Sequence, residues 1–325
     1  MAESQPLVSI VTPVYNGESF IRKSIESVLN QTYQNWDYLI QDNCCTDGTP
    51  EILDEFRNFD PRIRIERNSE LLPANANWNL AFSKISEKSE FAQMLHADDS
   101  LHPDCLSLKV DLALQHPSIG MVGSLTEGGE KIWGEGLDTN LQLFKGHEIA
   151  RDTLLSKVYP FLTPSVLLLR SDIVRARKPF YGDLIHSDVS ACYDILQEWD
   201  FGMTHEVLTY VSFPEDNITA LVAKPLNRLL ITNLDLLLTY GPEFLNQQEL
   251  DGAVSGRLRH YYRFLAKSLL EGRNAEFWDF HRQSMQEMSQ SINRIRLYQN
   301  LISECISHPK ASLWRLKQRL HPGAV

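Results

Sequence analysis

Short apolar runs and segments with helical periodicity alternate through about the first 125 residues of the chain. The apolar runs cover residues 8–14, 36–40, 63–66, 91–97 and 121–125, and the periodic segments cover 20–29, 51–59, 74–85 and 103–115. Buried strands of parallel sheets are short continuous apolar runs, whereas amphipathic helices repeat apolar residues every three or four positions. The alternation therefore predicts an α/β fold in which helices cover both faces of a mostly parallel sheet.

The pattern changes after residue 125. Residues 126–146 are rich in glycine and polar residues, and residues 147–225 mix helical pieces with β-rich runs at 165–169 and 207–213. From residue 226 onward only helical periodicity remains, and one of the apolar faces it predicts joins Met285, Met288, Ile292, Ile295 and Tyr298. We therefore predict an α/β domain over residues 1–225 and a C-terminal all-α extension over residues 226–325.

Composition and charge exclude several classes of protein. The chain has 31 basic and 42 acidic residues, a net charge of −11, which argues against a nucleic-acid binder that neutralises phosphates. Its five cysteines include no C-x-x-C pair, which argues against a disulfide framework or a structural zinc site. We see neither the features of a signal peptide nor a run of ~18 apolar residues that could cross a membrane. We therefore expect a cytoplasmic protein.

The most informative stretch is the apolar run 91–97, which ends in the adjacent carboxylates Asp98 and Asp99. Ligands of open α/β sheets bind at the carboxyl ends of the strands. Two neighbouring acids repel each other unless a cation offsets their charge. Mg²⁺ or Mn²⁺ fits this position, because such hard cations are held by one or two carboxylates together with substrate phosphates.

Four motifs in order along the chain resemble the family 2 glycosyltransferases. They are residues 9–16 (SIVTPVYN), residues 42–49 (DNCCTDGT), residues 95–99 (LHADD), and Ser187-Asp188 followed by residues 193–196. Each motif is weak alone, but their order and their places at strand ends are specific. The resemblance covers about residues 7–220.

This resemblance implies the GT-A fold and transfer with inversion from a nucleotide diphosphate sugar, first of all a UDP-sugar. The acceptor would be a saccharide or a lipid-linked molecule, in the synthesis of cell-surface polysaccharide or glycolipid. Residues 7–125 would form the nucleotide-sugar half of the domain and residues 126–225 the acceptor half. Asp98 and Asp99 would hold Mg²⁺ or Mn²⁺, and Asp188 would be the general base. The donor-binding residues would be Thr12, Pro13, Tyr15, Asn16, Asp42, Asn43, His96, Ala97 and Asp98.

Five positions depart from the family pattern, and two of them are Cys44 and Cys45, which replace the usual Gly-Ser or Ser-Ser. His96 stands where the family often has the first acid of an Asp-x-Asp motif, and a neutral imidazole is a poor ligand for Mg²⁺. Asn43 replaces a second aspartate, and Ser187 stands where an acid is common. Asp183 and Asp194 are alternative bases near Asp188.

Two other functions compete with this interpretation. A sugar nucleotidyltransferase would favour a glycine-rich, basic loop after the first strand, but residues 12–17 (TPVYNG) contain one glycine and no lysine. A non-catalytic binding or scaffold protein could keep the fold, and the departures at His96, Asn43 and Ser187 would suit it. Metal-dependent binding of UDP distinguishes an enzyme from a scaffold.

The last helical segment, residues 310–320, is basic and amphipathic. Lys310, Arg315, Lys317 and Arg319 stand beside Leu313, Trp314, Leu316 and Leu320. This pattern is typical of a helix on an anionic membrane surface. A solvated helix or a contact within a homo-oligomer fits the same pattern.

Overall fold

The computed structural model describes residues 5–182, 186–212 and 226–320. The chain divides into two compact units, Met1–Phe213 and Pro214–Val325. The division predicted from the sequence, at residue 225, falls at the end of the stretch 213–225, which lies outside the described residues. Each unit is described below by itself.

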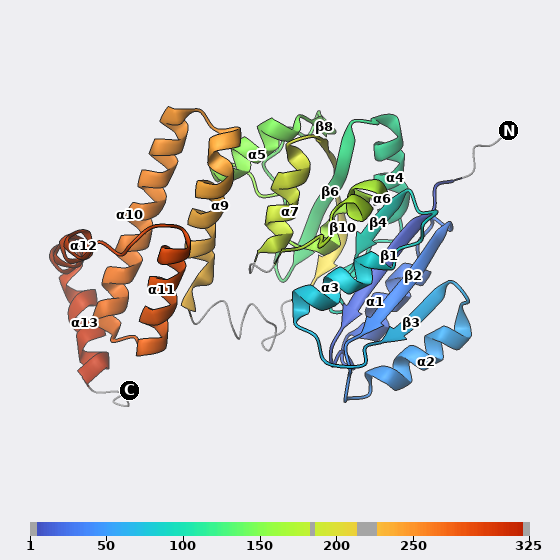
Figure 1. Cartoon of the computed structure of the whole chain (residues 1–325), viewed down its shortest axis with the longest axis horizontal. Coiled ribbons are helices and arrows are strands. Elements are labelled where there is room, and N and C mark those ends of the chain that lie inside the picture. The colour runs from blue at the N-terminus through green and yellow to red at the C-terminus, as the bar shows by residue number, and fades with distance from the viewer. Residues whose placement is uncertain (1–4, 183–185, 213–225, 321–325) are drawn as a thin grey trace. The chain divides into compact units, whose positions relative to one another are not determined.

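The first unit is built on one mixed, mostly parallel sheet (Figure 1). Its first four strands are β1 (Val8–Val14), β2 (Trp36–Asp42), β3 (Ile63–Arg67) and β4 (Phe91–Met94), which pair in parallel in the order β3-β2-β1-β4. The antiparallel strand β9 (Leu168–Arg170) joins β4 to β6 (Ile119–Gly128), and β10 (Asp200–Val211) runs parallel to β6. The short strands β5 (Ser100–Leu101), β7 (Lys131–Trp133) and β8 (Leu143–Phe144) pair with β10 or β6.

Helices cover both faces of this sheet. From β1 to β3 the chain moves in one direction through α1 (Ile21–Leu29) and α2 (Thr49–Phe59), and it returns to β4 through α3 (Ala74–Ser83). Right-handed crossovers therefore place α3 on the face opposite to α1 and α2. The remaining helices are α4 (Cys105–Gln115), α5 (Gly146–Leu154), α6 (Ser171–Ala176) and α7 (Ser187–Leu196).

The sequence predicted the first half of this unit well. Strand β1 has the predicted bounds. All seven of its residues are buried, and the run is apolar apart from Ser9 and Thr12, so its ends are easy to recognise in the sequence. The predicted strand 91–97 is shorter, since the chain turns after Met94 with a hydrogen bond from Asp99 N to His96 O at 3.0 Å. The β-rich run 165–169 is a 3-10 turn (Pro164–Val166) followed by β9, because Thr163 caps the turn and Pro164 starts it.

The second unit is helical where it is described. It contains α9 (Arg228–Phe244), α10 (Gln247–Glu271), α11 (Ala275–Glu287), α12 (Arg294–Ser307) and α13 (Pro309–Leu320), as Figure 1 shows in orange to red. Asparagines 246, 274 and 293 accept hydrogen bonds at the starts of α10, α11 and α12, which satisfies backbone N–H groups at those ends. A core around Tyr261, Leu265 and Phe277 holds the helices together.

One expected helical face does not exist as predicted. The chain breaks between α11 and α12, so Met285 is buried whereas Ile295 and Tyr298 are exposed. Apolar spacing alone does not reveal such a break or the direction in which the next helix turns its face. In the described part of the chain, no helix is both long and apolar enough to cross a membrane.

Candidate active site

Polar residues, most of them predicted from the sequence, lie along one edge of the sheet. Strands β1 to β4 are parallel neighbours, so their carboxyl ends share this edge. Arg67 ends β3, Asp42 ends β2, Tyr15 follows β1, and His96 comes two residues after β4. Topology therefore brings together side chains that are up to 81 positions apart in the sequence.

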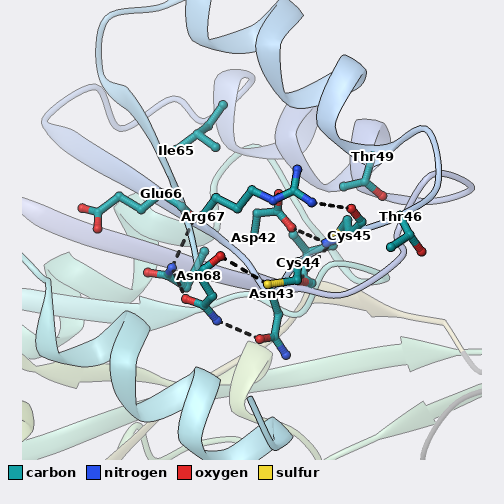
Figure 2. Close-up of polar contacts among 12 residues, drawn as sticks. Asp42, Asn43, Cys44, Cys45, Thr46, Thr49, Ile65, Glu66, Arg67 and Asn68 are labelled. Atoms are coloured by element: carbon teal, nitrogen blue, oxygen red, sulfur yellow. Dashed lines mark hydrogen bonds and ion pairs between the residues drawn. The ribbon is translucent and has the colours of Figure 1, made fainter. Parts of the chain in front are cut away.

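Asp42 and Arg67 form one end of this edge (Figure 2). The Asp42 carboxylate is buried, accepts a hydrogen bond from Cys45 N at 2.7 Å and lies 3.6 Å from Arg67 Nε. The Arg67 side chain is half exposed and also donates from Nη2 to Cys45 O at 2.8 Å. A fixed carboxylate beside an accessible guanidinium offers both an acceptor and donors to a ligand.

Asn43, next to Asp42, is fully engaged inside the protein. Its Oδ1 accepts hydrogen bonds from Asn68 Nδ2 and Leu72 N, and its Nδ2 donates to Leu72 O (Figure 2 shows the contact with Asn68). Cys44 follows in the left-handed region, with φ of 62°, and its thiol lies 3.2 Å from Asn68 O. Asn43, the residue after β2, therefore holds the loop that follows β3 in place.

The motif after β1 contributes exposed and buried groups. Tyr15 is 51% exposed, which leaves its ring free to pack against a ligand. Asn16 has φ of 50° and accepts a hydrogen bond from Thr46 N at 2.9 Å. Thr12 and Pro13 are buried, and the Thr12 hydroxyl lies 2.8 Å from the Tyr38 hydroxyl. Thr12 and Pro13 are therefore packed inside the protein and present no side chain at the surface.

The acidic cluster lies after β4. Ligand atoms of His96, Asp98 and Asp99 are all within 4.8 Å of one another. Asp99 is buried and accepts hydrogen bonds from Ser165 Oγ at 2.5 Å and from Ser212 N at 3.3 Å. Ser165 Oγ also accepts from His96 N at 3.0 Å, so this one hydroxyl joins both sides of the cluster. The buried Ala97 spaces His96 from Asp98.

The electrostatics of this cluster fit a divalent cation. Burial, together with the charge of Asp98, raises the pKa of Asp99 to about 7. Burial lowers the pKa of His96 more than the neighbouring Asp98 raises it, so the ring is neutral near pH 7. His96 Nε2 is buried without a hydrogen-bond partner, and Asp98 has no hydrogen bond or ion pair to any described residue. These donors suit Mg²⁺ or Mn²⁺, and an imidazole is acceptable to Mn²⁺ more than to Mg²⁺.

A chain of aromatic rings leads from this cluster toward Asp188. The His96 ring lies 4.8 Å from Trp78, and Trp78 lies 5.7 Å from Tyr181. Tyr181 and Asp188 both line a small cavity of about 10 Å³, and Thr163, which lines it too, lies 3.4 Å from His96 Nδ1. Thr163 therefore connects the cavity that Asp188 lines to the acidic cluster.

Asp188, the base expected from the sequence, lies at the start of α7. It is the second residue of α7, and burial raises its pKa to about 6 against the lowering by backbone N–H groups at that helix start. Of the two alternative bases expected from the sequence, Asp194 forms an ion pair with Arg177 at 2.7 Å. Asp183 lies outside the described residues.

Several residues of this site were not found from the sequence. Ser165 reaches Asp99 from 66 positions away, and no local motif marks it. Asn79 of α3 exchanges two hydrogen bonds with the backbone of Tyr181, which ties the segment before α7 to α3. Arg67 carries the same signal as Asp42, a polar residue at the end of a parallel strand.

Comparison with known proteins agrees with this geometry. The sequence model of Glycosyl transferase family 2 matches residues 9–177, just over half of the 325 residues. A Bacillus subtilis minor teichoic acid biosynthesis protein, GgaA, is 32% identical over 136 residues, which are 39% of this chain and 30% of GgaA. The Escherichia coli UDP-Glc:alpha-D-GlcNAc-diphosphoundecaprenol beta-1,3-glucosyltransferase WfgD is 35% identical over 118 residues, which are 36% of this chain and 45% of WfgD. The chain spans less than half the length of the curated relatives it matches.

Solved structures share the fold at low sequence identity. S. aureus TarS 1-349 in complex with UDP-GlcNAc superposes with a TM-score of 0.63 at 14% identity, covering 96% of this chain and 88% of TarS 1-349. The mannosyltransferase PcManGT from Pyrobaculum calidifontis, in complex with GDP-Man and Mn²⁺, gives a TM-score of 0.57 at 14% identity and covers 99% and 89% of the two chains. The protein has the GT-A fold and belongs to glycosyltransferase family 2.

Proposed function

We propose that this protein is a metal-dependent, inverting glycosyltransferase that uses a UDP-sugar as donor. The observation that carries this proposal is the cluster of His96, Asp98 and Asp99 on the sheet edge that also holds Asp42 and Arg67. The cluster offers ligands for a cation that binds a diphosphate, and the pair offers polar contacts for the nucleoside. Together they match the two ends of a nucleotide diphosphate sugar.

The nucleoside is assigned to the Asp42 end of the edge. Uracil presents one N–H donor and two carbonyl acceptors, which complement the carboxylate of Asp42 and the guanidinium of Arg67. The exposed Tyr15 ring is available to pack on the base, with Asn16 beside it. Bound UDP and UDP-GlcNAc in the structural neighbour TarS and the UDP-Glc donor in the name of WfgD support a uridine nucleotide.

Some predicted donor-binding residues are given an indirect role. The side chains of Thr12 and Asn43 are buried and bonded to Tyr38 and to the loop after β3, respectively. In this proposal they hold Asp42 and the neighbouring loop in place. Pro13 and Ala97 contribute backbone and shape.

The diphosphate is assigned to the acidic cluster, where Asp98 and Asp99 would hold Mg²⁺ or Mn²⁺ with His96 at its side. A divalent cation at this position supplies Lewis-acid stabilisation of the leaving diphosphate. Ser165 keeps Asp99 directed toward the cluster. Mn²⁺ in the structural neighbour PcManGT supports a divalent metal.

The transfer itself is assigned to Asp188. Its carboxylate takes the proton of the acceptor hydroxyl while the acceptor oxygen attacks the anomeric carbon from the side opposite to the diphosphate. The bond from the anomeric carbon to the diphosphate breaks in the same step, so the configuration inverts. The raised pKa of Asp188, about 6, suits a base that is ionised yet proton-accepting near pH 7.

The acceptor is proposed to be a saccharide or a lipid-linked saccharide. The relatives GgaA and WfgD carry teichoic acid synthesis and a diphosphoundecaprenol acceptor in their names, which supports a role in cell-surface polysaccharide or glycolipid synthesis.

A donor panel tests the proposal. UDP-, GDP- and dTDP-sugars are each incubated with the protein and Mn²⁺, and slow hydrolysis is measured by release of the nucleoside diphosphate. The proposal expects hydrolysis of UDP-sugars that EDTA abolishes. A non-catalytic homologue would release no diphosphate from any donor, and preference for GDP-sugars would overturn the uridine assignment.

A further inference from the structure

Helix α12 exposes a continuous apolar stripe. Ile295, Tyr298, Ile302 and Ile306 are spaced by three, four and four residues and are each 57% to 74% exposed. This spacing places them on one face of the helix. Leu297 and Glu304, on the other side, are buried in the helical unit. The stripe is thus a second apolar face, in addition to the one that packs into the core.

The next helix, α13, adds two exposed apolar side chains, Leu313 and Trp314. It also changes the membrane interpretation of residues 310–320. Arg315 does not face solvent freely but pairs with Glu304 at 3.3 Å and with Glu271 at 3.5 Å. Arg315 is therefore used to fix this helix, and among the residues whose side chains are described, α12 exposes more large apolar side chains than α13.

The stripe lies in the most basic part of the chain. Residues 288–325 contain six Lys and Arg against one acid, a net charge of +5, whereas the remaining 25 basic and 41 acidic residues give −16. The single acid, Glu304, is buried and lies within 3.7 Å of nitrogen atoms of Lys267, His308 and Arg315. Arg294 and Lys310 are exposed at the two ends of the stripe. The described surface around the stripe therefore carries cations and exposes no acid of its own segment.

We propose that the face of α12, continued by Leu313 and Trp314 of α13, docks on the surface of an anionic lipid bilayer. An apolar face flanked by Lys and Arg inserts among lipid headgroups and gains from their negative charge. The charge of −16 on the rest of the chain is repelled by the same surface, so attraction to anionic lipid comes from this basic segment. The inference does not depend on the proposed function.

Charge argues against the other occupants of this face. A symmetric dimer through the stripe would place the same cationic patch on both sides of the interface, where like charges repel. A protein partner would need a matching acidic, apolar surface. An anionic bilayer offers both properties over any area.

The test is co-sedimentation of the full chain with vesicles of phosphatidylcholine alone or mixed with phosphatidylglycerol. The proposal expects binding to the mixed vesicles only, which weakens as salt is added. The variant Ile302→Ser/Ile306→Ser removes apolar groups from exposed positions and is expected to lower the affinity roughly tenfold or more. The variant Arg294→Gln/Lys310→Gln is expected to lower it by ~25-fold, because each basic residue near the surface contributes roughly fivefold.

Matched controls make the outcome specific. Phe59→Ser/Leu71→Ser changes two apolar residues of the first unit that are also more than half exposed, and it is expected to bind vesicles like the wild type. Lys23→Gln/Lys88→Gln removes two exposed charges outside the segment and is also expected to have no effect. Circular dichroism checks that all variants keep their helix content.

Three results would overturn the proposal. The first is no binding of the wild type to either kind of vesicle. The second is binding that the α12 variants leave unchanged. The third is a wild type that is dimeric in solution and a monomeric Ile302→Ser/Ile306→Ser variant with undiminished vesicle binding, which would make the stripe a contact between copies of the chain.

Discussion

Ser165→Ala removes the hydroxyl that joins the two sides of the acidic cluster. The wild-type hydroxyl donates to Asp99 Oδ2 at 2.5 Å and accepts from His96 N at 3.0 Å. A hydrogen bond to a charged group contributes about 1.5–3 kcal/mol. Without it the Asp99 carboxylate keeps only the longer contact with Ser212 N, at 3.3 Å, and loses its fixed direction.

The expected consequence is weaker metal binding. Removing a residue that orients a metal ligand typically costs 10–100-fold in metal affinity. Isothermal titration of Mn²⁺ into the protein with saturating UDP measures this loss directly. We expect a fall of at least about tenfold for Ser165→Ala, while binding of UDP without metal stays the same.

Ser124→Ala is the matched control. Ser124 is also a buried serine of the same unit, but its hydroxyl has no hydrogen-bond partner among the described residues. We expect Mn²⁺ affinity within about twofold of the wild type for this variant. If Ser165→Ala and Ser124→Ala bind Mn²⁺ equally well, Ser165 does not position a metal ligand and the reasoning is refuted.

Three further predictions concern the base, the nucleoside and the link between the two halves of the site. Asp188→Asn should keep UDP affinity and lower kcat by at least about 100-fold. In the wild type, kcat/KM should fall as the pH drops below about 6, because a pKa raised to about 6 leaves the base protonated there. A flat pH profile down to pH 5 would count against Asp188 as the base. Arg67→Ala should weaken UDP binding by about tenfold, the equivalent of one charge-assisted hydrogen bond, whereas Arg57→Ala on the exposed side of α2 should not change it in the same titration. Asn79→Ala removes two hydrogen bonds at 2.8 Å to the backbone of Tyr181. It should lower the free energy of unfolding by about 1–3 kcal/mol, measured by urea titration. An unchanged urea midpoint would show that Asn79 does not hold the segment around Tyr181.

The sequence predicted those parts of the site that depend on local pattern. Asp42 and Asp98 were expected at the ends of strands because each comes after an apolar run, and the structure places both at the edge where the carboxyl ends of parallel strands meet. The fold class followed from the same alternation of strands and helices. These inferences need only the period of the apolar residues and the polar residues that end each run.

The sequence did not predict contacts that depend on the arrangement of distant segments. Ser165 reaches Asp99 because β9 lies antiparallel between β4 and β6, and this insertion has no local signature. The stripe on α12 was missed for a related reason. Periodicity identified Ile295 and Tyr298 as apolar positions but could not tell whether another element covers them.

The central claim is that Asp98 holds a metal that binds the diphosphate of the donor. The most direct test is UDP binding by calorimetry, with and without Mn²⁺, for the wild type and for Asp98→Asn, which keeps the size of the side chain and removes its charge. The proposal expects Mn²⁺ to strengthen UDP binding to the wild type and to leave binding to Asp98→Asn unchanged. The same gain from Mn²⁺ in both proteins would contradict the claim.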